Sequence, residues 1–159
     1  MSEKPIWAPW RIDYILSEKP KGCVLCDMPA DNDDNLHNIL YRGETCYVIM
    51  NLYPYNNGHM MVTPYRHISD YTELTSEELT ESARLTQRCV AAAKSALSAE
   101  GFNVGVNQGK SGGAGIEEHL HIHIVPRWIG DHNFMPVIGQ TKVIPQHVSE
   151  TCEMLKQKF

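Results

Sequence analysis

The sequence lacks the features that mark a nucleic-acid-binding, membrane-spanning or disulfide-rich protein. Its formal net charge is −5, whereas a general nucleic-acid binder carries a basic face. No apolar run approaches the length that crosses a membrane, and residues 1–5 lack the apolar stretch of a signal peptide. Its five cysteines, an odd number, suit a reducing compartment better than a disulfide framework. We therefore expect a cytoplasmic protein that binds neither nucleic acid nor membrane, although its charge is compatible with a small anionic ligand.

Length and composition indicate one globular domain over residues 1–159. The chain is 42% hydrophobic and 21% charged, and it contains no internal repeat or low-complexity segment. Residues 1–22 form an irregular N-terminal arm, whose Trp7 and Trp10 pack either on the domain's own core or across a partner subunit. Residues 128–159 form a C-terminal segment whose last part predicts a short helix.

Strand and helix patterns together predict an α+β domain. One long helix is expected over residues 76–100, because Thr75 suits an N-cap, apolar residues recur at three- and four-residue intervals, and Gly101 suits a helix end. We expect it to pack on an antiparallel sheet of about five strands. Alternating or short apolar runs bounded by turn residues place these strands at residues 38–42, 46–51, 59–64, 102–107 and 119–125.

Three histidines alternate with apolar residues in the last of these strands. Because strand side chains point to alternate faces, His119, His121 and His123 should project from one face, successive rings about 6.6 Å apart. Each imidazole brings two ring nitrogens that need partners, so the row indicates a chemical site rather than a structural one. Two chemistries fit the pattern: a metal bound by the histidines, or one nucleophilic imidazole oriented by its neighbours.

A Cys-x-x-Cys pair, Cys23 and Cys26, precedes the first predicted strand. Alone it is a weak signal that fits a redox pair, half of a zinc site or two core thiols. A thioredoxin-like role requires the pair to follow a strand and open a helix, and the preceding Lys21 and Gly22 predict neither. No second Cys-x-x-Cys follows, so a zinc ion here would need histidines to complete its ligands.

A glycine-rich segment, residues 108–115, leads into the histidine strand. A Walker A loop would have to open a helix, which this segment does not. Its glycines nevertheless let the backbone approach a phosphate and aim amides at it, while a flexible connector is the alternative interpretation. Because the histidine strand follows directly, we predict a phosphate-binding loop. Its candidate contacts are Asn107, Gln108, Ser111, Gly113 and Gly115.

The alternating histidine motif resembles that of the histidine triad (HIT) family of nucleotide hydrolases and transferases. The resemblance continues through Pro126, Arg127 and Trp128, as in the branch that acts on diadenosine polyphosphates, and includes the tryptophan-rich arm. It implies a HIT-like fold, a symmetric homodimer and a small nucleotide ligand such as AMP, ATP or a dinucleoside polyphosphate.

The same resemblance assigns roles to individual residues. It implies that His121 attacks the α-phosphorus and carries the nucleotide covalently, while His123 donates to a phosphate oxygen or the leaving group. Asn51 would bind a ribose, although alone it fits a turn residue. Trp128 and residues 130–137 would reach toward the substrate, either that of their own subunit or that of its partner.

The resemblance also implies a metal site. In zinc-carrying relatives a Cys-x-x-Cys, a histidine after the third strand and the first histidine of the motif form a tetrahedral set. Two thiolates and two imidazoles are the ligands of a structural zinc ion. A magnesium ion would accompany only the substrate polyphosphate. The implied zinc ligands here are Cys23, Cys26, His67 and His119.

The acceptor of the nucleotidyl group is indicated by one departure from the family pattern. Hydrolases that split dinucleoside polyphosphates carry a glutamine four residues before the first histidine, where this chain has Gly115. This difference favours inorganic phosphate over water as acceptor. Three alternatives stay open: a nucleoside phosphoramidate hydrolase, a nucleotide-binding module with little turnover, and a catalytic metal held by His119, His121 and His123.

Overall fold

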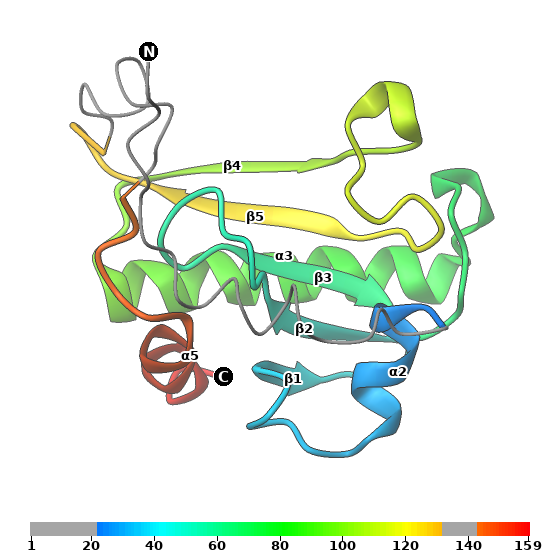
Figure 1. Ribbon diagram of the computed structural model, residues 1–159, viewed down its shortest axis with the longest axis horizontal. Coiled ribbons are helices and arrows are strands. Elements are labelled where there is room, and N and C mark those ends of the chain that lie inside the picture. Colours follow the sequence, from blue (N-terminus) through cyan, green and yellow to red (C-terminus); the bar gives the residue numbers. More distant parts are fainter. Residues whose placement is uncertain (1–21, 132–142) are drawn as a thin grey trace, which may run out of the picture.

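The structure is a computed structural model that describes residues 22–131 and 143–159 (Figure 1). Apart from Gly22, the predicted N-terminal arm lies outside these ranges, as do residues 132–137 of the segment expected near the substrate. Among the described helices, none is long and apolar enough to span a membrane.

A five-stranded antiparallel sheet forms the centre of the domain and confirms the predicted α+β class. Its strand order is β1-β2-β3-β5-β4, so the histidine strand β5 lies inside the sheet, between β3 and the edge strand β4. The strands are β1 (Ile39–Arg42), β2 (Cys46–Met50), β3 (Met60–Pro64), β4 (Gly101–Val106) and β5 (Ile122–Arg127).

The long helix α3 (Ser76–Leu97) covers one face of the sheet (Figure 1). Its start is the predicted one: the Thr75 side chain accepts from the amide of Glu78, and the Glu78 carboxylate accepts from the amide of Thr75. The end differs from the predicted residue 100. Ser98 adopts the left-handed conformation, and the amide of Glu100 already donates to the carbonyl of Arg127, so these residues belong to the approach to β4.

The two faces of the sheet bury separate hydrophobic clusters. On the α3 side, alternate residues of β2 and β3 pack with Leu85 and Cys89 of the helix and with Leu155 of α5 (Val148–Lys156), the predicted C-terminal helix. On the other side, Tyr47 and Met61 pack with Leu25 of a short helix α2 (Val24–Ala30). Because His123 pairs with Met61 in register, its side chain lies on the α2 side of the sheet.

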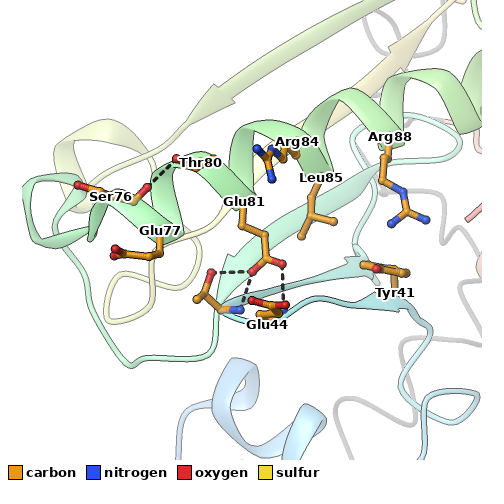
Figure 2. Close-up of a pocket in the computed structure, with 10 residues that line it drawn as sticks. Tyr41, Glu44, Ser76, Glu77, Thr80, Glu81, Arg84, Leu85 and Arg88 are labelled. Atoms are coloured by element: carbon orange, nitrogen blue, oxygen red, sulfur yellow. Dashed lines mark hydrogen bonds between the residues drawn. The ribbon is translucent and has the colours of Figure 1, made fainter.

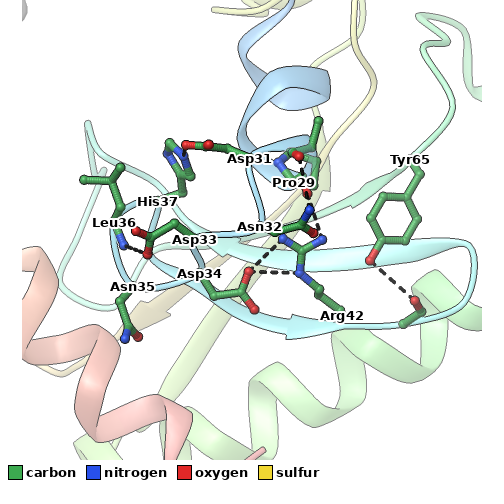
Figure 3. A network of polar contacts seen from close by, with 12 residues as sticks. Pro29, Asp31, Asn32, Asp33, Asp34, Asn35, Leu36, His37, Arg42 and Tyr65 are labelled. Atoms are coloured by element: carbon green, nitrogen blue, oxygen red, sulfur yellow. Dashed lines mark hydrogen bonds and ion pairs between the residues drawn. The ribbon is translucent and has the colours of Figure 1, made fainter.

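Helix α2 corrects the reading of the cysteine pair, because Cys23 is its N-cap and the pair therefore opens a helix. Two contacts of Arg42 connect this helix and the acidic loop that follows it to β1 (Figure 3). Arg42 of β1 pairs with Asp34 at 2.8 Å and also donates to the carbonyl of Pro29 at 2.9 Å. The cysteine pair is thus anchored to the sheet.

Candidate active site

The three histidines are buried on the face of the sheet that α3 does not cover, with exposed fractions of 0%, 4% and 7% for His119, His121 and His123. Strand β5 begins at Ile122 rather than at the predicted residue 119. The backbone before it is held differently: the amide of Leu120 donates to the carbonyl of Ile68 at 2.7 Å, and Thr63 donates to the carbonyl of Leu120 at 2.9 Å.

The hydrogen bond made by His121 determines which of its nitrogens is available for chemistry. Its Nδ1 lies 2.8 Å from the carbonyl oxygen of His119. A carbonyl only accepts, so Nδ1 carries the proton and Nε2 of the neutral ring carries the lone pair. The ring of His123 lies edge-on to that of His121, with centroids 4.7 Å apart. One imidazole therefore presents a lone pair beside a second imidazole.

A fourth histidine, His59, fixes the proton on His123. The backbone amide of Tyr55 donates to Nδ1 of His59 at 3.0 Å, so the His59 proton resides on Nε2. That Nε2 lies 2.9 Å from Nδ1 of His123, which must then accept. The remaining His123 proton is on Nε2, which is buried and finds no hydrogen-bond partner among the described residues. The site thus contains one N–H donor with no partner in the described chain.

Burial, together with the neighbouring His121, lowers the pKa of His123 to about 4. His123 is therefore neutral near pH 7 and acts as an N–H donor rather than as an imidazolium. His59 was missed by sequence reasoning, because a single histidine at the start of an apolar strand makes no pattern. Only its position just before β3, from which its ring contacts the ring of His123 on the neighbouring strand, reveals its function.

The predicted metal ligands do come together. One donor atom from each of the four side chains lies within 4.8 Å of the others, and Nδ1 of His119 is 3.2 Å from Sγ of Cys23 and 3.4 Å from Sγ of Cys26. Nδ1 of His67 lies 3.4 Å from Sγ of Cys26. The four residues of this Cys2His2 cluster are Cys23, Cys26, His67 and His119.

The chemistry of these donors fits a cation. Nε2 of His119 donates to the carbonyl of Pro64 at 2.9 Å, which leaves the Nδ1 lone pair directed at the sulfurs, as in a metal-bound histidine. Burial, with the adjacent Cys23, raises the pKa of Cys26 to about 11, so two thiolates here need a positive ion beside them. Zn²⁺ prefers such a set, with bonds of about 2.0–2.3 Å.

The residues predicted to contact the nucleotide are divided among several structural roles. The Asn51 side chain accepts from the amide of Tyr53 at 2.8 Å, the turn role considered as its alternative. Asn107 lies 3.5 Å from the Tyr55 hydroxyl, and Gln108 accepts from the amide of Tyr71 at 2.9 Å. Their nucleotide contacts stay predictions.

The glycine-rich loop follows β4 and contains a short 3₁₀ turn, η2 (Lys110–Gly112), which includes Ser111. Gly113 has φ of 79°, a conformation that favours glycine, whereas Gly115 has no positive φ. Trp128 follows the far end of β5, where its indole N–H donates to the carbonyls of Leu97 and Ser98 at the end of α3.

A cavity of about 530 Å³ lies elsewhere, between α3 and the β1–β2 turn (Figure 2). Its Glu81 carboxylate accepts hydrogen bonds from the amides of Glu44, Thr45 and Cys46. This carboxylate therefore closes the turn of the hairpin. The cavity is on the α3 side of the sheet, away from the histidines, so we place the chemistry at the histidine row.

The fold and the site define a class of protein. It is an enzyme whose reacting groups are histidines, held in a row on an antiparallel sheet that one long helix covers. Comparison with known proteins assigns this class to a family, because residues 32–128 match the model of the HIT domain. The chain belongs to the histidine triad (HIT) family, as its motif resemblance indicated.

Individual relatives agree with this assignment. The chain is 39% identical over 162 residues to the AP-4-A phosphorylase of Mycobacterium tuberculosis, a match that covers 97% of this chain and 83% of that protein. A Zn-bound histidine triad family protein from Mycobacterium smegmatis superposes with a TM-score of 0.71 at 28% identity, covering 86% of this chain and 92% of the other. A hypothetical histidine triad nucleotide-binding protein from Sulfolobus tokodaii gives a TM-score of 0.70 at 26% identity, with 86% and 91% covered.

Proposed function

We propose that this protein transfers a nucleotidyl group from the α-phosphorus of a dinucleoside polyphosphate, such as diadenosine tetraphosphate, to inorganic phosphate or water. The observation that carries the proposal is the tautomer of His121, whose Nε2 lone pair is available because Nδ1 donates to the carbonyl of His119. The 39% identical relative is an AP-4-A phosphorylase, which supports this substrate class.

The reaction proceeds in two displacements at phosphorus. Nε2 of His121 forms a bond to the α-phosphorus while the bond to the bridging oxygen breaks, and the distal nucleoside polyphosphate departs with the bonding electron pair. Diadenosine tetraphosphate thereby yields ATP and an adenylyl group on His121. An oxygen of inorganic phosphate then attacks this phosphorus and releases His121, giving ADP, whereas attack by water gives AMP.

His123 contributes the hydrogen-bond donor of this site. Its Nε2–H, set by the chain of contacts through His59, has no partner among the described residues and is directed to an oxygen that gains charge during the displacement. Because burial keeps the ring neutral, donation of this hydrogen bond costs no change of protonation near neutral pH.

We propose zinc as the ion of the Cys2His2 cluster, held by two thiolates and two imidazoles. When bound, this ion supplies positive charge and rigidity, not a reacting group. Bound there, it would fix the ring of His119, whose own carbonyl orients His121. Magnesium enters only with the substrate polyphosphate, in keeping with its preference for phosphate oxygens.

The nucleotide is held by groups around the histidine row. Asn107, which directly precedes the glycine-rich loop, lies next to Tyr55, which stacks on His123, and this proximity supports phosphate contacts from Gln108, Ser111, Gly113 and Gly115. Asn51 as the ribose contact and Trp128 as a further nucleotide contact are retained from the family resemblance. A symmetric homodimer is supported by β4, an edge strand whose Val104 is 50% exposed.

Product analysis tests the function directly. Purified protein is incubated with diadenosine tetraphosphate, with and without inorganic phosphate, and the nucleotides are separated. Formation of ADP and ATP in equal amounts only with phosphate supports the phosphorylase, and AMP with ATP supports hydrolysis. Cleavage of a nucleoside phosphoramidate with no cleavage of dinucleotides would replace the proposed substrate class by the phosphoramidate alternative.

A further inference from the structure

Tyr55, in the connector between β2 and β3, contacts the histidines through both its backbone and its ring. Its amide donates to Nδ1 of His59 at 3.0 Å, the first contact of the chain that ends at Nε2 of His123. Its ring lies over both imidazoles, with centroids 4.6 Å from His59 and 5.4 Å from His123. The interplanar angle to His123 is 27°, close to parallel stacking.

The ring of Tyr55 separates these imidazoles from solvent. Tyr55 is 47% exposed, whereas His59 and His123 beneath it are 0% and 7% exposed. Its hydroxyl lies 3.5 Å from Nδ2 of Asn107, where β4 passes into the glycine-rich loop. One side chain thus covers the histidine pair and extends to the start of the predicted phosphate-binding loop.

The groups that surround His123 show why the ring of Tyr55 matters for its burial. The titratable groups that face its ring are His121 on its own strand, His59 next to β3, and Tyr55 itself. From β4 the residue paired with His123 is Gly105, which has no side chain. Among the described neighbours of His123, Tyr55 is therefore the residue whose ring can be removed without changing a histidine.

We propose that Tyr55 is a positioning residue for His123: its amide and its stacked ring together hold His123 neutral, with the proton on Nε2. The inference deepens the proposed function and rests on it, because that proton is the one donated to the phosphate group. Removing the ring admits water beside the imidazole pair, and the low pKa of His123 then returns toward that of an exposed histidine. A protonated Nδ1 would face the Nε2–H of His59, which breaks the contact between the two rings.

The test compares Tyr55→Ala with Tyr55→Phe, since phenylalanine keeps the stacked ring and loses only the hydroxyl. The matched control is Tyr53→Ala, which removes a similarly exposed ring from the same connector. Both alanine variants keep their backbone amides. Circular dichroism checks folding, and Tyr55→Leu serves as the second variant because its side chain is apolar but too small to cover both imidazoles as the planar ring does.

The first measurement is independent of turnover. In ¹⁵N-labelled protein, the Nδ1 and Nε2 shifts of His123, assigned with His123→Gln, report its tautomer and its titration. We expect one tautomer with Nε2 protonated in the wild type, Tyr55→Phe and Tyr53→Ala. In Tyr55→Ala and Tyr55→Leu we expect mixed tautomers and a midpoint at higher pH. Identical His123 signals in wild type and Tyr55→Ala would overturn the proposal.

The second measurement is the rate of dinucleotide cleavage. Tyr55→Ala should lower kcat about tenfold, part of the effect of a positioned proton donor, and should leave KM within about twofold. Each variant's rate is divided by the wild-type rate at the same pH, and this ratio should fall further between pH 7 and pH 5. Equal loss in Tyr53→Ala and Tyr55→Ala would contradict the role of Tyr55. Wild-type protein that shows the expected His123 tautomer but cleaves no dinucleotide would refute the proposed function and leave the positioning of His123 standing.

Discussion

The ring of His119 and the ring of His121 are connected through a single carbonyl group. The carbonyl of His119 accepts from Nδ1 of His121 at 2.8 Å, while the ring of His119 lies 3.2 Å from the sulfur of Cys23. One residue thus belongs to the Cys2His2 cluster through its side chain and orients the proposed nucleophile through its backbone. Structural stability and catalytic geometry are therefore coupled at His119.

Replacement of His121 by alanine should abolish turnover and leave mononucleotide binding largely intact. Loss of a covalent catalyst removes on the order of 5 kcal/mol or more of transition-state stabilisation. Steady-state rates and AMP titration measure the two effects, and His37→Ala, which changes a histidine outside the site, is the control. In the wild type, mass spectrometry at neutral pH should find an AMP adduct within residues 119–123. Near-normal turnover of His121→Ala would exclude the mechanism.

Replacement of His123 by glutamine should reduce kcat less, by roughly 10²–10⁴-fold. It should also change the pH dependence of stability. The folded pKa of about 4 is below the usual 6.5, so the unfolded chain binds the proton more readily and wild-type stability falls as the pH falls between these values. Through this one group, the free energy of unfolding changes by at most about 1.4 kcal/mol per pH unit. Urea unfolding should show that His123→Gln loses less stability than the wild type between pH 7 and pH 4.

Removal of one metal ligand should act first on folding. Cys23→Ser is expected to lose its metal and to melt at lower temperature, because binding free energy of a structural ion is also folding free energy. Cys152→Ala, which changes a buried thiol of α5, should keep the metal. Elemental analysis and calorimetry provide the measurements. Wild-type protein that is purified without metal and has the same melting temperature as the zinc-loaded form would contradict the site.

Glu78→Gln should destabilise the protein by about 1–3 kcal/mol at pH 7, since Arg66 loses its charged partner. Hydrogen bonds from Arg66 hold the pKa of Glu78 below its usual range. Its stabilisation is therefore present above the unfolded pKa and is lost as the pH falls through the lower folded value. Denaturation curves of the wild type and the variant should converge in acid. Glu77→Gln, in the same helical turn, is the control, and an equal effect there would argue against a specific pair.

Sequence patterns predicted the elements well where local chemistry determines them. The capping box at Thr75 marks the start of α3, and the alternation around His123 gave both its strand and its face. The family resemblance predicted that Cys23 and His119 lie in one metal site, although they are 96 positions apart in the chain. No periodicity alone could have paired these two.

The errors arise where tertiary contacts replace local preference. Residues 119–121 read as strand, yet the backbone of Leu120 bonds to the carbonyl of Ile68 and to the side-chain hydroxyl of Thr63, and not to the backbone of a neighbouring strand. Helix α2 contains Pro29, and Cys23 gives it no side-chain cap, so its pattern was too weak to predict. His59 makes its decisive contact with a residue 64 positions away, which only the folded sheet specifies.

The start of β5 at Ile122 places His121, the proposed nucleophile, one residue outside the ladder that joins β3, β5 and β4. Amides inside such a ladder exchange with solvent mainly through global unfolding, whereas a segment beside it can open alone. His121 lies in such a segment beside the ladder, where the His119 carbonyl and the contacts of Leu120 hold it. On heating, local opening of residues 119–121 should inactivate the enzyme below its melting temperature, and bound metal should bring the two temperatures together.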